Sequence, residues 1–562
     1  MNKSIKRLFS GVMATAFAVM ALTACGDSES TGSADVISSD KEATTENASE
    51  GMQSLDDIEG NTENNGVVAD SVTMAIQSYA TLSPWGTNVA YEYNAEVYEY
   101  LFAQDSNSDT FFPVLADASR GEFGGYDHEA GTGDYTVYIY DYIHDSEGNK
   151  ITASDVKFSF EYQKENATTS GWQTFQGVEV VDDTTCIFHF DRELNKIGEL
   201  KNVWARCVIV SEAGFNASPS ALASDMCGTG PYKLKEYSSG AKVVLEINDD
   251  YWQTNEELLT QRQMQNVKEI TYVFQDDAAQ QIIGLQTGDI DVVPNVSSSS
   301  LTDFTTGSYA ADFNVTEWLQ LGVRYIAANC SSDSLCGDVN LRNAIFYAID
   351  NNGLAAALGS GTSEPCHSMI SSAFPEYDTD WESWDNYMNV TDYDLAKEYL
   401  EKSSYNGEEL VLMCESVYNP AAEIIQSMCL QVGINVKIAN YDKSTLTDLK
   451  GKPAEWDLII DNNAGDAGYT QLQHVWDVSI VDGTRTENYI VDSQWQDMLD
   501  AISTIDGTTK ENWDAWMQHC YDNAYGKALI SEVNHIVTRS NIVSVVRTDK
   551  NKLMPGGFIY SE

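Results

Sequence analysis

Apolar and polar residues alternate along some short stretches of the chain and recur at helical spacing along longer ones. Strict alternation predicts strands at 135–140, 185–190 and 242–247. Apolar stripes of helical period predict helices at 94–102, 276–287, 340–349, 394–402 and 420–432. Asp394 is a start signal for one of these helices, and Gly288 and Gly433 are stop signals for two others. This mixture, without an internal repeat, predicts α/β or α+β domains.

The beginning of the chain follows a different pattern. A basic segment at 3–7 precedes an apolar run at 8–24, an order that is typical of an export signal. The run is shorter than the roughly 20 residues that span a bilayer. It ends in Leu-Thr-Ala-Cys25, which resembles the bacterial lipobox. This resemblance implies a signal peptide at 1–24 and lipid attachment at Cys25, whereas the alternative is an ordinary cleavage site with an incidental cysteine.

A polar, acidic segment follows the lipobox. Residues 25–69 are rich in Ser, Thr, Gly, Asn, Asp and Glu, with Lys41 as the only base and no aromatic residue. Such a composition buries too little apolar surface to offset the entropy of the chain. We therefore expect a disordered acidic tether that holds a globular body near a membrane.

Composition narrows the possible partners of the body. About 490 residues are enough for two or three domains, and thirty Tyr and twelve Trp residues indicate a packed core. The formal net charge is −54, which excludes nucleic acid as a partner because phosphate binding needs a basic surface.

Nine cysteines remain beyond Cys25, an odd number. We expect buried free thiols, although Cys330 and Cys336 are close enough in sequence to bridge.

Familiar catalytic motifs do not occur in the sequence. There is no G-x-S-x-G, H-E-x-x-H, G-x-x-x-x-G-K-[ST] or G-x-G-x-x-G. Asp289 and Asp291 form an acid pair, but helix-end capping explains them better than acid–base chemistry. The seven His residues are scattered and none stands at ligand spacing from another. We expect no catalytic residue, no metal site and no other cofactor.

Seven segments, in order, resemble the bacterial extracellular solute-binding proteins of family 5, which serve oligopeptide, dipeptide and nickel transporters. The resemblance spans about 71–545. Its most specific segment is Gly-Thr-Gly-Pro-Tyr232, followed by Asn-Asp-Asp-Tyr-Trp252. The other six segments are 81–85, 96–102, 113–116, 135–160, 284–292 and 338–350.

Two of these motifs also have a mechanical interpretation. Gly228, Gly230 and Pro231 suit a sharp turn, because glycine reaches positive φ and proline fixes φ. Thr152 to Asp155 place a cap before an apolar periodic run, as the start of a helix requires. We expect these residues to be scaffold rather than binding site.

The resemblance implies an α/β, two-lobed fold of the periplasmic-binding-protein type (class II) with an inserted domain and mixed sheets flanked by helices. Domain I takes 70–105, 225–318 and 528–562, domain II is the insert at 106–224, and domain III is 319–527. The lobes close around a solute by hinge motion. The implied protein is a monomer, lipid-anchored to the outer face of the cytoplasmic membrane, that captures a peptide and delivers it to an ABC permease with its ATPase subunits.

The resemblance also nominates ligand-binding residues. In oligopeptide binders, an aspartate after a strand of the far lobe pairs with the α-ammonium of the peptide, and Asp466 falls at that place, although Asn-Asn replaces the Gly-Trp of the family. The alternative is a solvated loop acid. The loop after Pro84 nominates Trp85, Asn88 and Tyr91, with packed core as the alternative. Arg324 is a candidate to hold a carboxylate, with a structural salt bridge as the alternative.

Other functions stay open at this point. The same transport role for an oligosaccharide, suggested by the many Trp and Tyr residues, or for a metal chelate would leave the fold unchanged. A sensory lipoprotein would use the same body. A secreted hydrolase is the alternative of another class.

Overall fold

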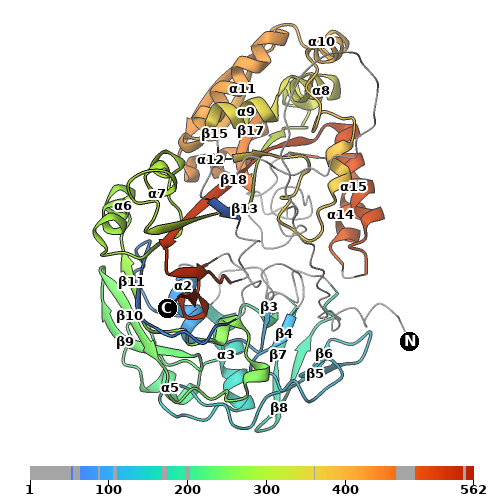
Figure 1. Cartoon of the computed structure of the whole chain (residues 1–562). Coiled ribbons are helices and arrows are strands. Elements are labelled where there is room, and N and C mark those ends of the chain that lie inside the picture. Colours follow the sequence, from blue (N-terminus) through green and yellow to red (C-terminus); the bar gives the residue numbers. More distant parts are fainter. Residues whose placement is uncertain are drawn as a thin grey trace, which may run out of the picture.

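The computed structural model describes residues 52–54, 64–85, 89–104, 111–166, 174–195, 203–359, 361, 363–463, 472, 488–490, 492–504, 506–548 and 552–561. Figure 1 shows a lower and an upper half, which two long strands join. These strands are β13 (Phe313–Ala328) and β18 (Gly526–Arg539). Among the described residues, no helix has both the length and the apolar character to cross a membrane.

One mixed sheet of twelve described strands runs through both halves. Strand β1 (Met52–Ser54) pairs with β13, and β14 (Ser363–Pro365) pairs with β18. The other ten strands lie side by side in the order β16 (Asn435–Tyr441), β15 (Glu409–Glu415), β17 (Leu458–Asn463), β13, β18, β12 (Val292–Val293), β2 (Ala69–Ile76), β11 (Val267–Phe274), β10 (Lys242–Ile247) and β9 (Tyr232–Ser238).

The two long strands are the link between the halves. They pair antiparallel from Phe313↔Arg539 to Ala327↔Gly526. At one end β12 continues the sheet beside β18, and at the other end β17 continues it beside β13. A hydrogen bond of 3.3 Å from Ser298 Oγ to the carbonyl oxygen of Gly361 makes a further contact between the halves.

Smaller sheets complete the lower half. A four-stranded antiparallel sheet packs against helix α3 (Ala153–Asn166). Its strands, in spatial order, are β5 (Tyr126–His128), β6 (Asp134–Tyr138), β8 (Thr185–Phe190) and β7 (Phe175–Asp182). Two hairpin-like pairs are β3 (Phe102–Gln104) with β4 (Phe111–Pro113), and β19 (Ile542–Ser544) with β20 (Ile559–Tyr560).

In the upper half, helices lie on both sides of the sheet (Figure 1). The remaining described α-helices are α2 (Tyr91–Val97), α5 (Glu212–Ala217), α6 (Ala278–Thr287), α7 (Thr302–Thr305), α8 (Val339–Ala348), α9 (Asn351–Leu358), α10 (Tyr393–Lys402), α11 (Asn419–Val432), α12 (Lys443–Lys450), α14 (Ser493–Ile502) and α15 (Lys510–Asn523). Short 3₁₀ turns are η3 (Glu256–Leu258), η4 (Gln261–Gln263), η5 (Ser298–Ser300), η6 (Leu335–Gly337), η7 (Thr379–Ser383), η8 (Ser416–Tyr418), η9 (Pro453–Glu455) and η10 (Pro555–Gly557).

Local signals in the sequence account for most helix ends. Helix α6 ends at Gly288 and α11 at Gly433, both in the left-handed region with φ of 87° and 94°, as predicted. Helix α10 begins at Tyr393, one residue before the predicted start, because the N-cap is Asp392, whose side chain accepts from the backbone N–H groups of Asp394 and Leu395. At the start of α3, the backbone N–H and the hydroxyl of Thr152 both donate to Asp155 Oδ2 at 2.8 Å, and the expected cap is confirmed.

The helix predicted at 94–102 is wrong in its bounds. Helix α2 ends at Val97, Tyr98 is extended, and Phe102 already belongs to β3. The backbone N–H of Gly230 donates a hydrogen bond of 2.8 Å to the carbonyl oxygen of Val97. In a longer helix, this oxygen would accept from a backbone N–H four residues further along the helix. A distant segment therefore ends this helix.

The glycines of the Gly-Thr-Gly-Pro segment serve a different purpose from the one predicted. Neither Gly228 nor Gly230 has a positive φ. A Cβ on Gly228 would lie 2.0 Å from the Val97 carbonyl oxygen, and one on Gly230 would lie 2.5 Å from the Glu96 carbonyl oxygen. Glycine is required here for close packing against the end of α2, not for a left-handed turn.

Buried apolar residues gather in separate clusters in the two halves. The upper cluster contains five fully buried tryptophans, which are Trp381, Trp456, Trp495, Trp513 and Trp516.

The nine described cysteines are all free, and Cys330 and Cys336 form no bridge. Burial raises the pKa of Cys186 and Cys429 to about 12, so these thiols stay protonated and unreactive at neutral pH.

Candidate functional site

The two long strands β13 and β18, which we call the crossing strands, carry polar side chains at the junction of the two halves. Their register shifts between Leu319 and Val323, so that strand β13 has extra residues where it passes from one half to the other. A bulge of this kind bends a strand and increases its local twist. Gln320 lies in this bulge and donates from Nε2 to Asn534 Oδ1 of β18 at 2.7 Å.

Arg324 stands on β13 just beyond the bulge and is 8% exposed. Its guanidinium forms an ion pair with Glu532 of β18. The same group lies over the ring of Tyr418, with 4.5 Å between the guanidinium carbon and the ring centroid. Burial raises the pKa of Tyr418 to about 12, so its hydroxyl remains neutral. Arg324 is thus held by a carboxylate and an aromatic ring of its own chain.

An aromatic and a cationic residue meet on the lower side of the bulge. The Arg547 guanidinium lies 5.7 Å from the ring centroid of Trp318. Trp318 stands opposite Asn534, to which Gln320 donates its hydrogen bond, and Arg324 pairs with Glu532, which shares a face of β18 with Asn534. We call these five residues the crossing row.

Strand β17 leads the chain to the crossing row. It pairs antiparallel with β13 and ends at Asn463, opposite Val323. Asp461 on this strand forms an ion pair with Lys450 Nζ at 2.6 Å, and both side chains are largely buried. A Cβ on Gly322 would lie 3.0 Å from Asn462 Nδ2, so β17 and the bulge approach each other closely. Asp466, three residues beyond β17, lies outside the described residues, as do Asn88 and Cys25.

Trp85 follows β2 and packs into a group of aromatic rings. Its ring centroid lies 4.7 Å from that of Tyr162, 5.8 Å from that of Phe215 and 6.3 Å from that of Phe158. The side chain is 7% exposed, and its Nε1–H has no hydrogen-bond partner among the described residues. Trp85 therefore belongs to a packed aromatic cluster that ties the loop after β2 to α3 and α5.

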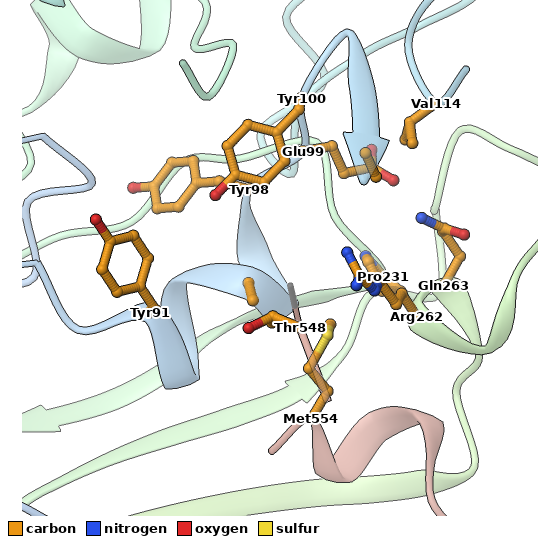
Figure 2. A pocket seen from close by; sticks show the side chains of 12 residues that line it. Tyr91, Tyr98, Glu99, Tyr100, Val114, Pro231, Arg262, Gln263, Thr548 and Met554 are labelled. Carbon is orange, nitrogen blue, oxygen red and sulfur yellow. The ribbon is translucent and has the colours of Figure 1, made fainter. Parts of the chain in front are cut away.

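Tyr91 is the first residue of α2 and lines a small pocket with a volume of about 30 Å³. Figure 2 shows Tyr91 on one side of this pocket, with Pro231, Arg262 and Gln263 on the other. None of its described lining residues lies on β13, β17 or β18. The free space is narrow and suits ordered water better than a solute. The structure does not bring Tyr91 together with Arg324.

Glu99 lines the same pocket and is buried. The hydroxyl of Tyr251 and Nε1 of Trp252 donate to its two carboxylate oxygens at 2.7 Å and 2.8 Å. Burial raises the pKa of Glu99 to about 7, and these hydrogen bonds oppose the rise. This Glu–Tyr–Trp contact joins the segment just after α2 to the Tyr251–Trp252 segment and is structural.

Four members of the crossing row were not predicted from the sequence. Trp318, Gln320, Glu532 and Asn534 stand on strands more than two hundred residues apart, and only the antiparallel register of β13 and β18 brings them together. Neither strand shows a regular apolar–polar alternation that would have indicated this pairing.

A comparison with protein families finds one match over 112–475, to the description "Bacterial extracellular solute-binding proteins, family 5 Middle". The chain is 24% identical over 342 residues to the dipeptide-binding protein of Escherichia coli (strain K12), covering 57% of this chain and 61% of that protein. It is 24% identical over 361 residues to the oligopeptide-binding protein AppA of Bacillus subtilis (strain 168), covering 58% and 61%. The matched part is thus about three fifths of the length of these relatives.

Solved structures share the fold over nearly the whole described chain. HbpA2 from Haemophilus parasuis matches with a TM-score of 0.74 at 19% identity, covering 88% of this chain and 100% of that one. NikA from Brucella suis, in complex with Fe(III)-EDTA, gives a TM-score of 0.71 at 17% identity over 87% and 100%. AppA from Bacillus subtilis, in complex with a nonapeptide, gives 0.64 at 18% identity over 88% and 100%.

Proposed function

The chain belongs to the bacterial extracellular solute-binding proteins of family 5, and we propose that it is the solute-binding component of an ABC importer that captures a peptide. The names of the relatives support a peptide ligand, since they include a dipeptide-binding and an oligopeptide-binding protein. Binding and release are sufficient for this role, and the family is a transport family, so we propose no reaction on the ligand.

The observation that carries this proposal is the pair of crossing strands. Two covalent links with a bulge at 319–323 form a hinge, and the crossing row places hydrogen-bonding and aromatic side chains at that hinge. Closure of the halves would bury a solute beside this row. The division into domain I (70–105, 225–318, 528–562), domain II (106–224) and domain III (319–527) is part of the proposal.

Asp466 is the proposed anchor for the α-ammonium of the peptide. The end of β17 opposite Val323 supports this role, because the chain leaves the strand beside the bulge only three residues before Asp466. A carboxylate that is enclosed by closure needs a cationic partner, and a charge-assisted hydrogen bond supplies one. Asn88 remains a proposed wall of the cleft. Arg324 is proposed to fix Glu532 at the hinge instead of holding a ligand carboxylate.

Binding assays on the purified mature chain test this function. We expect a peptide at about 100-fold its dissociation constant to stabilise the fold by about 2.7 kcal/mol, seen as a rise in Tm. Asp466→Asn should abolish the shift, whereas Asp394→Asn is a matched control, since the Asp394 side chain is 97% exposed on α10. A shift with metal chelates only, or with oligosaccharides only where Asp466→Asn abolishes it, would reject the peptide and retain the transport role.

Membrane attachment through Cys25 is the second part of the proposal. The lipobox-like Leu-Thr-Ala-Cys25 and the acidic tether at 25–69 support it. Expressed in a bacterium fed a radiolabelled fatty acid, the wild-type chain should carry label and stay with the membrane fraction. Cys25→Ser should lose the label. A labelled Cys25→Ser chain would contradict lipid attachment at this residue.

A further inference from the structure

A second cavity opens on the lower half, at the junction of the four-stranded sheet with η3. Its volume is about 730 Å³. Its walls come from the turn after β4, the segment after β6, and η3. No residue of the crossing row lines it. This cavity is therefore separate from the hinge, and what it binds does not depend on the proposed transport function.

The floor of the cavity is aromatic. The rings of Tyr140 and Tyr142 line it, with centroids 5.3 Å apart, and Trp252 packs against both at 5.8 Å and 5.7 Å. The Tyr140 hydroxyl accepts a hydrogen bond from the backbone N–H of Ala118 at 3.0 Å. Tyr142 is 45% exposed, although its ring is supported from below. An exposed ring that is already fixed offers an apolar face at little entropic cost.

Hydrogen-bond donors and hydrogen-bond acceptors surround this aromatic floor. Asp117 accepts from the Ser119 backbone N–H and hydroxyl with Oδ1, at 3.0 Å and 2.6 Å, and keeps Oδ2 as an acceptor. Asn255 uses its side-chain oxygen to cap η3, so its NH₂ group remains a donor. Asp141 is exposed and makes no hydrogen bond or ion pair with a described residue.

The one cation among the described lining residues is held in place. Arg120 lies over the ring of Tyr138, 4.3 Å from the centroid, and donates to Thr184 Oγ1 at 3.1 Å and Thr185 Oγ1 at 3.2 Å. The cavity therefore presents fixed donors and acceptors around an aromatic ring. Asp117, Asp141 and the net charge of −54 disfavour an anionic ligand, and Arg120 offsets the charge of one of the two carboxylates.

We propose that this cavity is a second ligand site and that it binds an uncharged oligosaccharide. A pyranose ring has an apolar C–H face, which can lie on Tyr142, and hydroxyl groups around its edge, each of which both donates and accepts. The mixed rim of Asp117, Asp141 and Asn255 matches that edge. Few polar groups around an apolar floor are the usual composition of a small-molecule site.

The test is calorimetric titration of the purified mature chain with three neutral trisaccharides, namely cellotriose, maltotriose and N-acetylated chitotriose. We expect at least one to bind. Tyr142→Ala should weaken its affinity by about tenfold, which is about 1.4 kcal/mol. Tyr142→Phe is the matched control and should retain binding, because stacking needs only the ring. Asp141→Asn, a change on the surface, should weaken binding without altering Tm.

The outcomes separate this proposal from the hinge. Binding that survives both Tyr142→Ala and Asp141→Asn would place the saccharide elsewhere and overturn the proposal, as would the failure of all three trisaccharides to bind. Asp466→Asn should leave saccharide affinity unchanged. Failure of peptide binding, with saccharide binding intact, would reject the proposed transport ligand alone.

Discussion

Three glutamates of the segment 92–99 are buried, and the carboxyl group of each has a different kind of polar partner. Glu92 pairs with Lys552 Nζ at 2.9 Å, and Glu99 accepts from Tyr251 and Trp252. Glu96 is fully buried and accepts from the Gly556 backbone N–H at 3.0 Å, while its Oε2 has no hydrogen-bond partner among the described residues. Burial raises the pKa of Glu96 to about 8. The folded protein therefore holds this carboxyl group protonated at neutral pH.

Glu96 should make the stability of the protein fall as the pH rises. Its pKa is about 8 in the folded state, against the ordinary value of 4.5 in an unfolded chain, so the native state keeps a proton that the unfolded state releases between these values. This contribution is complete below about pH 4.5 and is lost as the pH approaches 8, with a slope of up to about 1.4 kcal/mol per pH unit. In Glu96→Gln, urea unfolding at pH 6, 7 and 8 should show a smaller decline than in the wild type.

The matched control for this pH series is Glu401→Gln on the exposed side of α10. It should reproduce the wild-type decline, because an exposed carboxyl group has nearly the same surroundings in both states. Equal slopes for Glu96→Gln and the wild type would show that Glu96 is ionised in the folded protein.

Single residues also show where sequence reasoning stops. Arg324 was one of the ligand-binding candidates, with a salt bridge as the alternative, and it pairs with Glu532, 208 positions away. No pattern near Arg324 indicates this partner, because the pairing depends on the register of β13 and β18. Trp85 was assigned to the cleft from its position in the family, and its contacts with Tyr162, Phe158 and Phe215 come from helices that follow much later.

Elements whose ends are set locally were predicted well. The bounds of β8 and β10 agree with the alternation at 185–190 and 242–247, and α6 and α11 end at their glycines. Helix α2 was misjudged because Gly228 and Gly230 of a remote segment determine where it ends. Local periodicity carries no information about such a contact.

Packing of this remote segment against α2 makes Gly228 intolerant of a side chain. A Cβ there would lie 2.0 Å from the backbone oxygen of Val97, which cannot move without distorting the helix end. We expect Gly228→Ala to destabilise the protein by about 3 kcal/mol or more. Gly240→Ala is the control, since Gly240 has a φ of +71° and no atom within 4 Å of its Cβ. Backbone strain alone should cost it about 1–2 kcal/mol.

Thermal and urea unfolding of the two glycine variants, measured side by side, separate steric exclusion from strain. A clearly larger loss in Gly228→Ala agrees with close packing against α2. Equal losses in both variants would mean that the segment moves away from Val97, and that the contact is not what ends the helix.

The whole molecule has the two-lobed α/β fold that the ordered motifs implied, and the likeness to solved family structures confirms it. Seven motifs in sequence order identify a family because each marks a fixed point of a shared scaffold. The residues that bind the ligand are harder to predict from these motifs than the fold. The proposed anchor, Asp466, rests on one weakly matching segment, and a binding site varies among relatives while the scaffold is retained.

The charge of the whole molecule leads to a prediction about salt. A net charge of −54 makes the folded state repel itself, because folding concentrates the carboxylates on one compact surface. Raising the ionic strength from about 0.01 M to about 0.1 M shortens the screening length from about 30 Å to about 10 Å. We therefore expect the Tm of the mature chain at pH 7 to rise with added NaCl. Near pH 4.2, the isoelectric point of the sequence, the same addition should have little effect, because protonation has removed most of the charge. A Tm at pH 7 that does not respond to salt would mean that paired charges such as Lys235–Glu269 already offset the repulsion.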